Sequence, residues 1–153
     1  MSIHFHIQKP LVYELKKQKI IKKWLKEVAK SENKKVKTLT YILCNDNDLH
    51  KINVAYLNHD TLTDVITFDN SPFFDENAPK NKKIKHIEGD IFISLDRVKE
   101  NAKKYKTKTK LELKRVMVHG LLHLIGYADK KTKEQKIMRE KENFYLAKFN
   151  EIK

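Results

Sequence analysis

The stretch VMVHGLLHLIGYAD, residues 116–129, carries the strongest structural signal in this 153-residue chain. It places His119 and His123 four residues apart, follows them with Gly126 and ends at Asp129, in the spacing H-x3-H-x2-G-x2-D. Residues four apart on an α-helix share a face and lie ~6 Å apart along the axis, so both imidazoles can reach one ion. A glycine at position 126 can end the helix and turn the chain back. Asp129 could then return to the ion as its third ligand.

The same helix is expected to be buried. Between Val116 and Tyr127 no residue carries a fixed charge, and apolar residues occupy every side, which is typical of a central helix. Two histidines there are either core residues, each satisfied by a hydrogen bond, or metal ligands. Imidazoles one turn apart must stay neutral or repel in a dry interior, and a metal removes that difficulty, so a metal site is favoured. Gly120 indicates a close approach by another backbone or by a ligand.

The donor set indicates a type of chemistry. A His, His, Asp set favours zinc, and a fourth position left to water is typical of a catalytic site. Because zinc lowers the pKa of its bound water toward ~7, we expect one Zn²⁺ per chain, with that water as nucleophile. No general base is identified. The metalloprotease signature H-E-x-x-H needs Glu where this chain has Gly120, so that class of peptidase is disfavoured.

Length and composition limit the class of protein further. A chain of this size is ordinarily one domain, here residues 1–153, with one core. The lone Cys44 offers no disulfide framework, and the sequence shows no N-terminal signal, so we expect a cytoplasmic location. No apolar run approaches the ~20 residues that span a bilayer, so no membrane partner is expected. The oligomeric state is not indicated.

The net charge of +13 predicts a polyanionic partner such as a nucleic acid. A solvated basic surface is the competing interpretation. Of the 33 basic residues only Arg97, Arg115 and Arg139 are Arg, and base composition of a genome can produce such a lysine bias without selection for binding.

The hydrophobic periodicities predict an α+β domain, with a central sheet of about four strands packed by about five helices. Strands are expected at 4–8, 38–44, 65–68 and 88–95. One long amphipathic helix is expected over 11–33, and shorter ones after the caps at 45–48 and at Ser94. TKLE (109–112) and TKEQ (132–135) fit the capping box and should open the last two helices. A polar loop before residue 65 is a second place where the scaffold could carry a site.

Three segments together resemble the YbeY family of bacterial rRNA maturation factors. HGLLHLIGYAD (119–129) is similar to the family signature H-G-x-L-H-L-x-G-Y-D-H. INVAYLNHDTLTDVITFD (52–69) resembles the family segment N-x-x-Y-R-x-x-D-x-x-T-D-V-L-S-F, and GDIFIS (89–94) resembles the strand G-D-I-x-I-S. Their order and the chain length also agree.

The resemblance implies an α+β fold with a zinc-type site on the histidine helix. It also implies single-strand-specific endoribonuclease activity in small-subunit rRNA processing and ribosome assembly, with rRNA and the small subunit as partners. His119 and His123 match the first two metal ligands. Candidate substrate-binding residues in the second segment are His59, Thr63 and Asp64, and Thr63, Asp64 and Phe68 match the strand motif beside the site.

Two positions depart from the family pattern. The third ligand is usually a His after Asp, and the matching pair here is Ala128 and Asp129, so Asp129 must ligate in its place. A carboxylate oxygen is an ordinary zinc ligand. Leu57 stands where the family commonly carries Arg and cannot hold a phosphate, so either His59 or a nearby lysine has taken over or phosphate cleavage is weaker.

The leading hypothesis is therefore a metal-dependent endoribonuclease and rRNA maturation factor, whose Lys-rich first and third helices hold the RNA backbone. Two alternatives stay open. One is a ribosome-assembly or RNA-binding factor that needs the metal only for folding. The other is a metal-dependent hydrolase of an unrelated small substrate, which the net charge makes less favourable.

Overall fold

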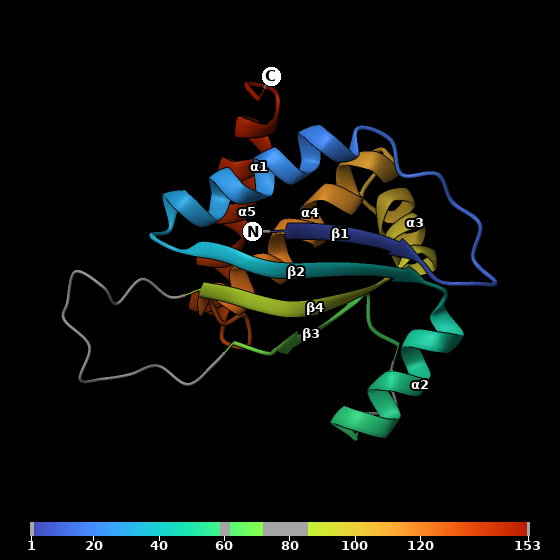
Figure 1. The fold of residues 1–153 in the computed structure, drawn as a ribbon. Helices are drawn as coiled ribbons and strands as arrows, with labels where there is room; N and C mark the ends of the chain where they lie inside the picture. The colour runs from blue at the N-terminus through green and yellow to red at the C-terminus, as the bar shows by residue number, and fades with distance from the viewer. Residues whose placement is uncertain (1, 59–61, 72–85, 153) are drawn as a thin grey trace.

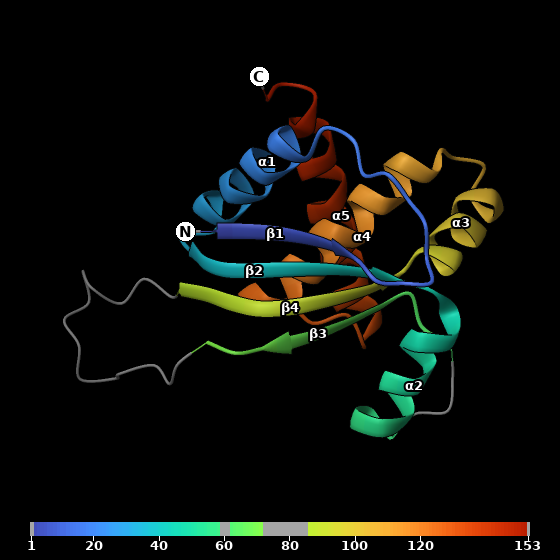
Figure 2. The same cartoon turned by 45° about the vertical axis from the view of Figure 1, so that its right-hand side comes forward.

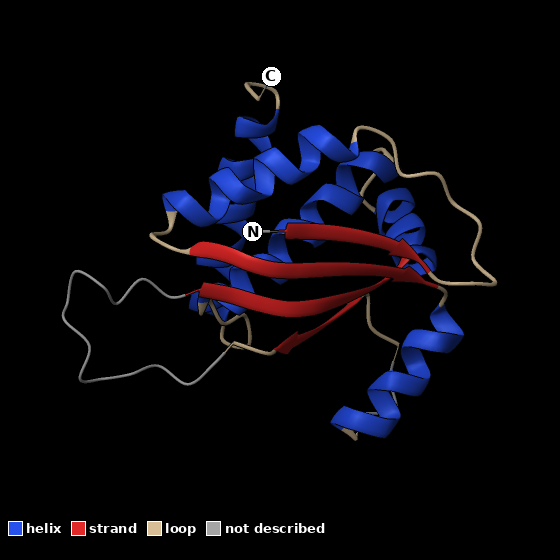
Figure 3. Ribbon diagram, viewed as in Figure 1, coloured by secondary structure: helices blue, strands red, loops and turns tan. Residues whose placement is uncertain are grey.

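Four strands of the chain form one mixed sheet in the order β1-β2-β4-β3 (Figures 1 and 3). The computed structural model describes residues 2–58, 62–71 and 86–152. Strands β1, β2 and β4 run parallel, and β3 pairs antiparallel with β4 at the sheet edge. The strands are β1 Ser2–Ile7, β2 Lys35–Cys44, β3 Val65–Asp69 and β4 His86–Ser94.

Five helices in the described residues pack on this sheet, mostly on one face. They are α1 Gln18–Ser31, α2 Asp46–Leu57, α3 Leu95–Lys104, α4 Thr109–Ile125 and α5 Thr132–Phe149. Figure 2 shows α2 on the opposite side of the sheet from the other four. It covers a smaller apolar cluster there, which includes Cys44, Leu49 and Ile66. The predicted α+β class, with four strands and five helices, is confirmed.

The main core lies between the sheet and helices α1, α3, α4 and α5. Alternate residues of β4 face it, with Ile87, Ile91 and Ile93 all buried, as expected for the period of two along a strand. Helix α4 packs so closely on β4 that a Cβ added at Gly120 would lie 2.9 Å from Ile91 Cγ2. The predicted close approach at Gly120 therefore exists, but a strand side chain makes it, where another backbone or a ligand had been expected.

Two buried hydrogen bonds tie the layers together. Trp24 Nε1 of α1 donates to the Tyr145 carbonyl of α5 at 2.7 Å, and Tyr41 Oη of β2 donates to the Met117 carbonyl of α4 at 2.9 Å. Both donors are fully buried, so each needs such a partner. Together with the apolar contacts they hold α4 in the middle of the domain.

The helix predicted over residues 11–33 begins only at Gln18. Lys17, just before it, has φ 58° in the left-handed region, which cannot continue a helix backward. Leu11, Tyr13 and Leu15 pack on the core from an irregular segment. These three apolar residues recur at every second position, which is a strand-like spacing. The helical period that starts at Ile21 therefore does not extend through them.

The predicted helix caps divide into two groups. Asn45 Oδ1 accepts from the Asp48 N–H at 2.8 Å and Ser94 Oγ accepts from the Arg97 N–H at 3.2 Å, which confirms both side-chain caps. The prediction of a capping box at 109–112 is wrong, because Thr109 lies inside the helix and cannot be its N-cap. The helix begins one residue earlier, where the Lys108 carbonyl accepts from the Glu112 N–H at 3.1 Å.

The capping box predicted at 132–135 is also wrong, because Thr132 is already the first residue of α5 and Lys131, one residue earlier, is its N-cap. A box shifted by one residue forms instead, in which Glu134 accepts from the Lys131 N–H at 2.9 Å. Across the described ranges, none of the helices combines the length and apolar character needed to span a bilayer.

We predict that Gly89→Ala destabilises the fold. A Cβ at residue 89 would lie 2.5 Å from the carbonyl oxygen of Phe68 on β3, and backbone cannot move aside as a flexible side chain can. The expected loss is about 1–3 kcal/mol of unfolding free energy, measured by urea denaturation. Lys37→Ala, at an exposed site on β2, should change it by no more than about 0.5 kcal/mol. Equal free energies of unfolding for the two variants would contradict the close approach between residue 89 and the Phe68 carbonyl.

Candidate metal centre

The C-terminal half of α4 carries two histidines on one face and then stops at a glycine. Gly126 has φ 128°, a backbone angle that residues with a side chain rarely adopt, and a Cβ added there would meet nothing within 4 Å. The conformation, rather than lack of space, is therefore what requires glycine. The Gly126 and Tyr127 N–H groups donate to the Leu122 carbonyl at 3.1 and 3.0 Å, which closes the last turn. The predicted helix stop is confirmed.

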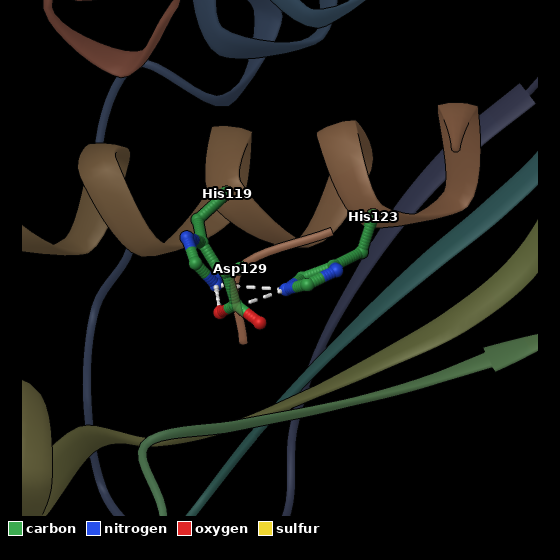
Figure 4. A group of neighbouring side chains, drawn as sticks. All are labelled: His119, His123 and Asp129. Atoms are coloured by element: carbon green, nitrogen blue, oxygen red, sulfur yellow. Dashed lines mark hydrogen bonds and ion pairs between the residues drawn. The ribbon is translucent and has the colours of Figure 1, made fainter. Parts of the chain in front are cut away.

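After this stop the chain turns back and brings Asp129 beside both histidines (Figure 4). The Nε2 atoms of His119 and His123 are 3.0 Å apart. Asp129 Oδ2 lies 3.2 Å from each of them. Three potential ligand atoms thus form a nearly equilateral triangle, and the structure brings together all three residues that the spacing predicted.

The size of this triangle suits a small divalent cation. Four-coordinate zinc, with ligand distances of about 2.0–2.2 Å, has neighbouring ligand atoms about 3.3 Å apart. The three separations of 3.0–3.2 Å are slightly shorter than that. Two imidazole lone pairs so close together would repel unless a proton or a cation lay between them. The donor atoms are nitrogen, nitrogen and oxygen, a set that zinc accepts.

A buried carboxylate behind His119 fixes the orientation of its ring. His119 Nδ1 donates to Glu142 Oε2 at 2.7 Å, which leaves the Nε2 lone pair facing the triangle. The other carboxylate oxygen accepts from Arg115 Nη1 at 3.1 Å, and the Glu142 side chain is only 6% exposed. Burial alone would raise the pKa of Glu142, but the hydrogen bonds from His119 and Arg115 hold it below its ordinary value. Glu142 is therefore a charged acceptor.

Glu142 is a site residue that was not predicted from the sequence, although a signal for it exists. The buried residues of α5 recur at helical spacing, and one of them is acidic: Met138, Glu142, Tyr145, Leu146 and Phe149. A glutamate on the apolar stripe of a helix needs a cationic or hydrogen-bonding partner inside the fold. The stripe alone could have marked Glu142 as a site residue, without showing which partner it meets.

The candidate metal centre opens on a cleft of about 580 Å³ between α3, α4 and α5. His119 and Asp129 form part of its wall. The other described residues lining it come from the three helices and from the end of the loop before β3: Asp64, Asn101, Tyr105, Glu112, Arg115, Val116, Thr132, Gln135, Lys136, Met138, Arg139 and Glu142. Helix α1, one of the two helices expected to hold RNA, contributes none of them.

The three substrate-binding candidates have different outcomes. Asp64 lines the cleft, and its backbone carbonyl accepts from the Ser94 N–H at 2.9 Å, which fixes it beside the end of β4. Burial raises the pKa of Asp64, opposed by the nearby charge of His119. Thr63 does not line the cleft, and its hydroxyl donates to the Val65 carbonyl at 3.3 Å. His59 lies outside the described residues.

Two other positions of the second motif lie away from the cleft. Phe68 packs edge-to-face with Tyr56 and Phe92, at centroid distances of 5.9 and 5.7 Å, in the apolar cluster under α2. It belongs to the strand motif but faces away from the histidines. Leu57 ends α2, is exposed and is not among the residues that line the cleft.

A family model described as "YbeY: Endoribonuclease YbeY" matches residues 2–150. The chain belongs to the YbeY family. A Cytophaga hutchinsonii protein named Endoribonuclease YbeY is 46% identical over 143 residues, which cover 94% of this chain and 93% of that one. A Christiangramia forsetii protein of the same name is 41% identical over 138 residues, with coverage of 90% and 89%. The family predicted from the three motifs is confirmed.

A solved structure agrees with the fold of this YbeY-family chain. The solution structure of a Thermotoga maritima protein aligns with a TM-score of 0.60 and 28% sequence identity, over 97% of this chain and 89% of that one. The α+β arrangement of the sheet and helices is thus shared with an experimentally determined relative. In this chain, His119 and His123 lie on the buried helix α4, as the sequence predicted.

We predict that Glu142→Gln weakens metal binding by the chain. The amide keeps the shape of the side chain but loses the negative charge that orients His119 and strengthens its lone pair. Loss of such an outer partner typically costs about 10–100-fold in metal affinity. The dissociation constant for Zn²⁺ should rise by about that factor, measured by competition with a chelator. The matched control is Glu140→Gln, on the exposed side of α5. An unchanged constant for Glu142→Gln would contradict the role of this carboxylate.

Proposed function

We propose that this chain is a metal-dependent endoribonuclease that cuts single-stranded RNA during maturation of small-subunit rRNA, with the small ribosomal subunit as its partner. Membership of the YbeY family and relatives named Endoribonuclease YbeY support the activity. The observation that carries the proposal is the convergence of His119, His123 and Asp129, because two of the three, His119 and Asp129, line an open cleft.

The openness of the site favours a catalytic over a structural metal. Structural zinc sites are closed by four protein ligands, whereas catalytic sites use three and leave a position free. Among the residues that the structure describes, the ligand group has three members, and the Asp129 side chain is 37% exposed. A substrate phosphate in the cleft can therefore come within reach of the ligand triangle.

His119, His123 and Asp129 would hold one ion per chain, and we infer Zn²⁺ from the two imidazoles and one carboxylate. Such an ion supplies a Lewis acid that polarises a phosphate oxygen and makes a nucleophile of water near neutral pH. Glu142 keeps the His119 ring in the ligating orientation through its Nδ1–H. Arg115 in turn keeps Glu142 ionised.

The remaining walls of the cleft suit a single RNA strand. Arg139 and Lys136 of α5 can pair with backbone phosphates, and the Arg139 side chain is 56% exposed. Tyr105, at the end of α3, is 57% exposed and offers a ring on which an unpaired base can stack. Stacked bases inside a duplex cannot reach such a ring, so the cleft favours unpaired RNA. The net charge of +13 adds attraction for RNA at longer range.

Asp64 is the remaining acidic group that we assign to substrate binding. Because burial raises its pKa, this carboxyl retains a proton more readily than a free aspartate does. A protonated carboxyl can donate a hydrogen bond to a phosphate oxygen, whereas a carboxylate would repel it. We also infer a cytoplasmic location, because Cys44 is free and buried and the family acts on ribosomal RNA.

We predict that the metal-loaded protein cleaves single-stranded RNA and that metal-free protein does not. His123→Ala is the preferred variant for the test, because it removes one ligand and leaves the hydrogen bond between His119 and Glu142 in place. Cleavage by this variant should fall to background, measured by gel electrophoresis of a labelled RNA. His86→Ala, at an exposed site on β4, is purified in parallel and should cleave like the unchanged protein.

Two outcomes would contradict the proposal. Equal cleavage by the His123→Ala variant would mean that a contaminating nuclease cuts the RNA. Salt-sensitive RNA binding without cleavage by well-loaded protein would instead indicate an assembly factor with a structural metal.

A further inference from the structure

We propose that Glu32 acts through the hydroxyl of Tyr127 as a positioning residue for the metal centre, by holding the turn that carries Asp129. This inference rests on the proposed metal site. It adds the C-cap residue of α1, far away in the sequence, to the support of the third ligand. Nothing in the spacing of the histidine motif points to Glu32.

The turn that carries Asp129 has no regular secondary structure of its own. It lies between α4, which ends at Ile125, and α5, which begins at Thr132. An anchor holds each end. On one side the Tyr127 N–H donates to the Leu122 carbonyl at 3.0 Å. On the other the Lys131 N–H donates to Glu134 at 2.9 Å. Asp129 is two residues from each of these anchored positions, Tyr127 and Lys131, so the backbone of the turn has little conformational freedom.

The first anchor is reinforced by the side chain of Tyr127. Its hydroxyl donates to Glu32 Oε1, and the second oxygen of Glu32 accepts from Tyr145 and, at 3.1 Å, from Lys141 Nζ. Glu32 is the C-cap residue of α1, and its side chain is only 9% exposed. One carboxylate thus joins the end of α1, the turn after α4 and the middle of α5.

The charge of Glu32 makes this anchor strong. Burial by itself would raise its pKa, but hydrogen bonds from Tyr127, Tyr145 and Lys141 hold the pKa below its ordinary value. Hydrogen bonds to an ionised acceptor are shorter and about twice as strong as those between neutral groups. The Lys141 ammonium also lies 5.6 Å from the centre of the Tyr127 ring, where its charge favours the aromatic face.

Asp129 needs such support because its side chain is short. A ligating imidazole reaches farther from the backbone than a carboxylate does, so the backbone of an Asp ligand must lie closer to the ion. Small displacements of the turn therefore change the position of Oδ2 directly. In this structure that atom lies at the same distance, 3.2 Å, from both histidine nitrogens.

Two tyrosines bound to the same carboxylate provide a matched pair of variants. Tyr127→Phe removes the hydroxyl that ties the turn to Glu32, and Tyr145→Phe removes one that ties α5 to Glu32. We expect Tyr127→Phe to raise the dissociation constant for Zn²⁺ by about 10-fold, as loss of outer support does at other metal sites. Tyr145→Phe should change it by less than about twofold. Both are measured by chelator competition without RNA, after thermal unfolding shows that each variant is folded.

A double-mutant cycle separates positioning from a general loss of stability. We expect the two histidines to retain weaker Zn²⁺ binding in the Asp129→Ala background, where Tyr127→Phe should have no further effect on the dissociation constant. An equal effect in both backgrounds would overturn the inference, as would equal effects of Tyr127→Phe and Tyr145→Phe. If the unchanged chain binds no metal, the metal site itself is wrong. If it binds metal and Tyr127→Phe leaves affinity unchanged, only the role of Glu32 and Tyr127 is wrong.

Discussion

The packing of α4 against β4 is the constraint on which the rest of the structure depends. Gly120 lets the helix approach until Ile91 fills the place of a side chain, and helices α1, α3 and α5 enclose its remaining sides. A helix held this firmly can present two histidines in one orientation. The site then lies where α4 emerges from the core, at its C-terminal end, so that a rigid element supplies the ligands and a cleft supplies access.

Charge is balanced around this buried helix in a chain of contacts. Arg115 pairs with Glu142, Glu142 accepts from His119, and His119 faces Asp129. Each member is half-buried or buried, so removing one takes a charge-assisted contact from its neighbour in a medium of low dielectric. A divalent ion beside Asp129 would neutralise the negative charge that remains at the end of the chain of contacts. The same contacts hold the ligands in place, and neutralisation of Asp129 by the ion would reduce the repulsion between the cleft and a negatively charged phosphate.

The parts of this account that the sequence predicts are those determined by local geometry. The H-x3-H pair follows from the pitch of a helix, and the stop at Gly126 follows from the conformations open to glycine. Glu142 and Glu32 escaped prediction because their partners lie 23 and 95 residues away, and only the packed fold brings them together. The start of α1 was misplaced for a different reason, since apolar residues at alternate positions before Gln18 also face the core.

The central claim is that Asp129 completes a metal site with His119 and His123. The most direct measurement is the anomalous scattering of a crystal of protein purified without chelators. We expect one peak per chain, bonded to the Nε2 atoms of both histidines and to the Asp129 carboxylate at about 2.0–2.2 Å. A fully folded crystal with no metal between the histidines, or with a metal that Asp129 does not touch, would contradict the claim.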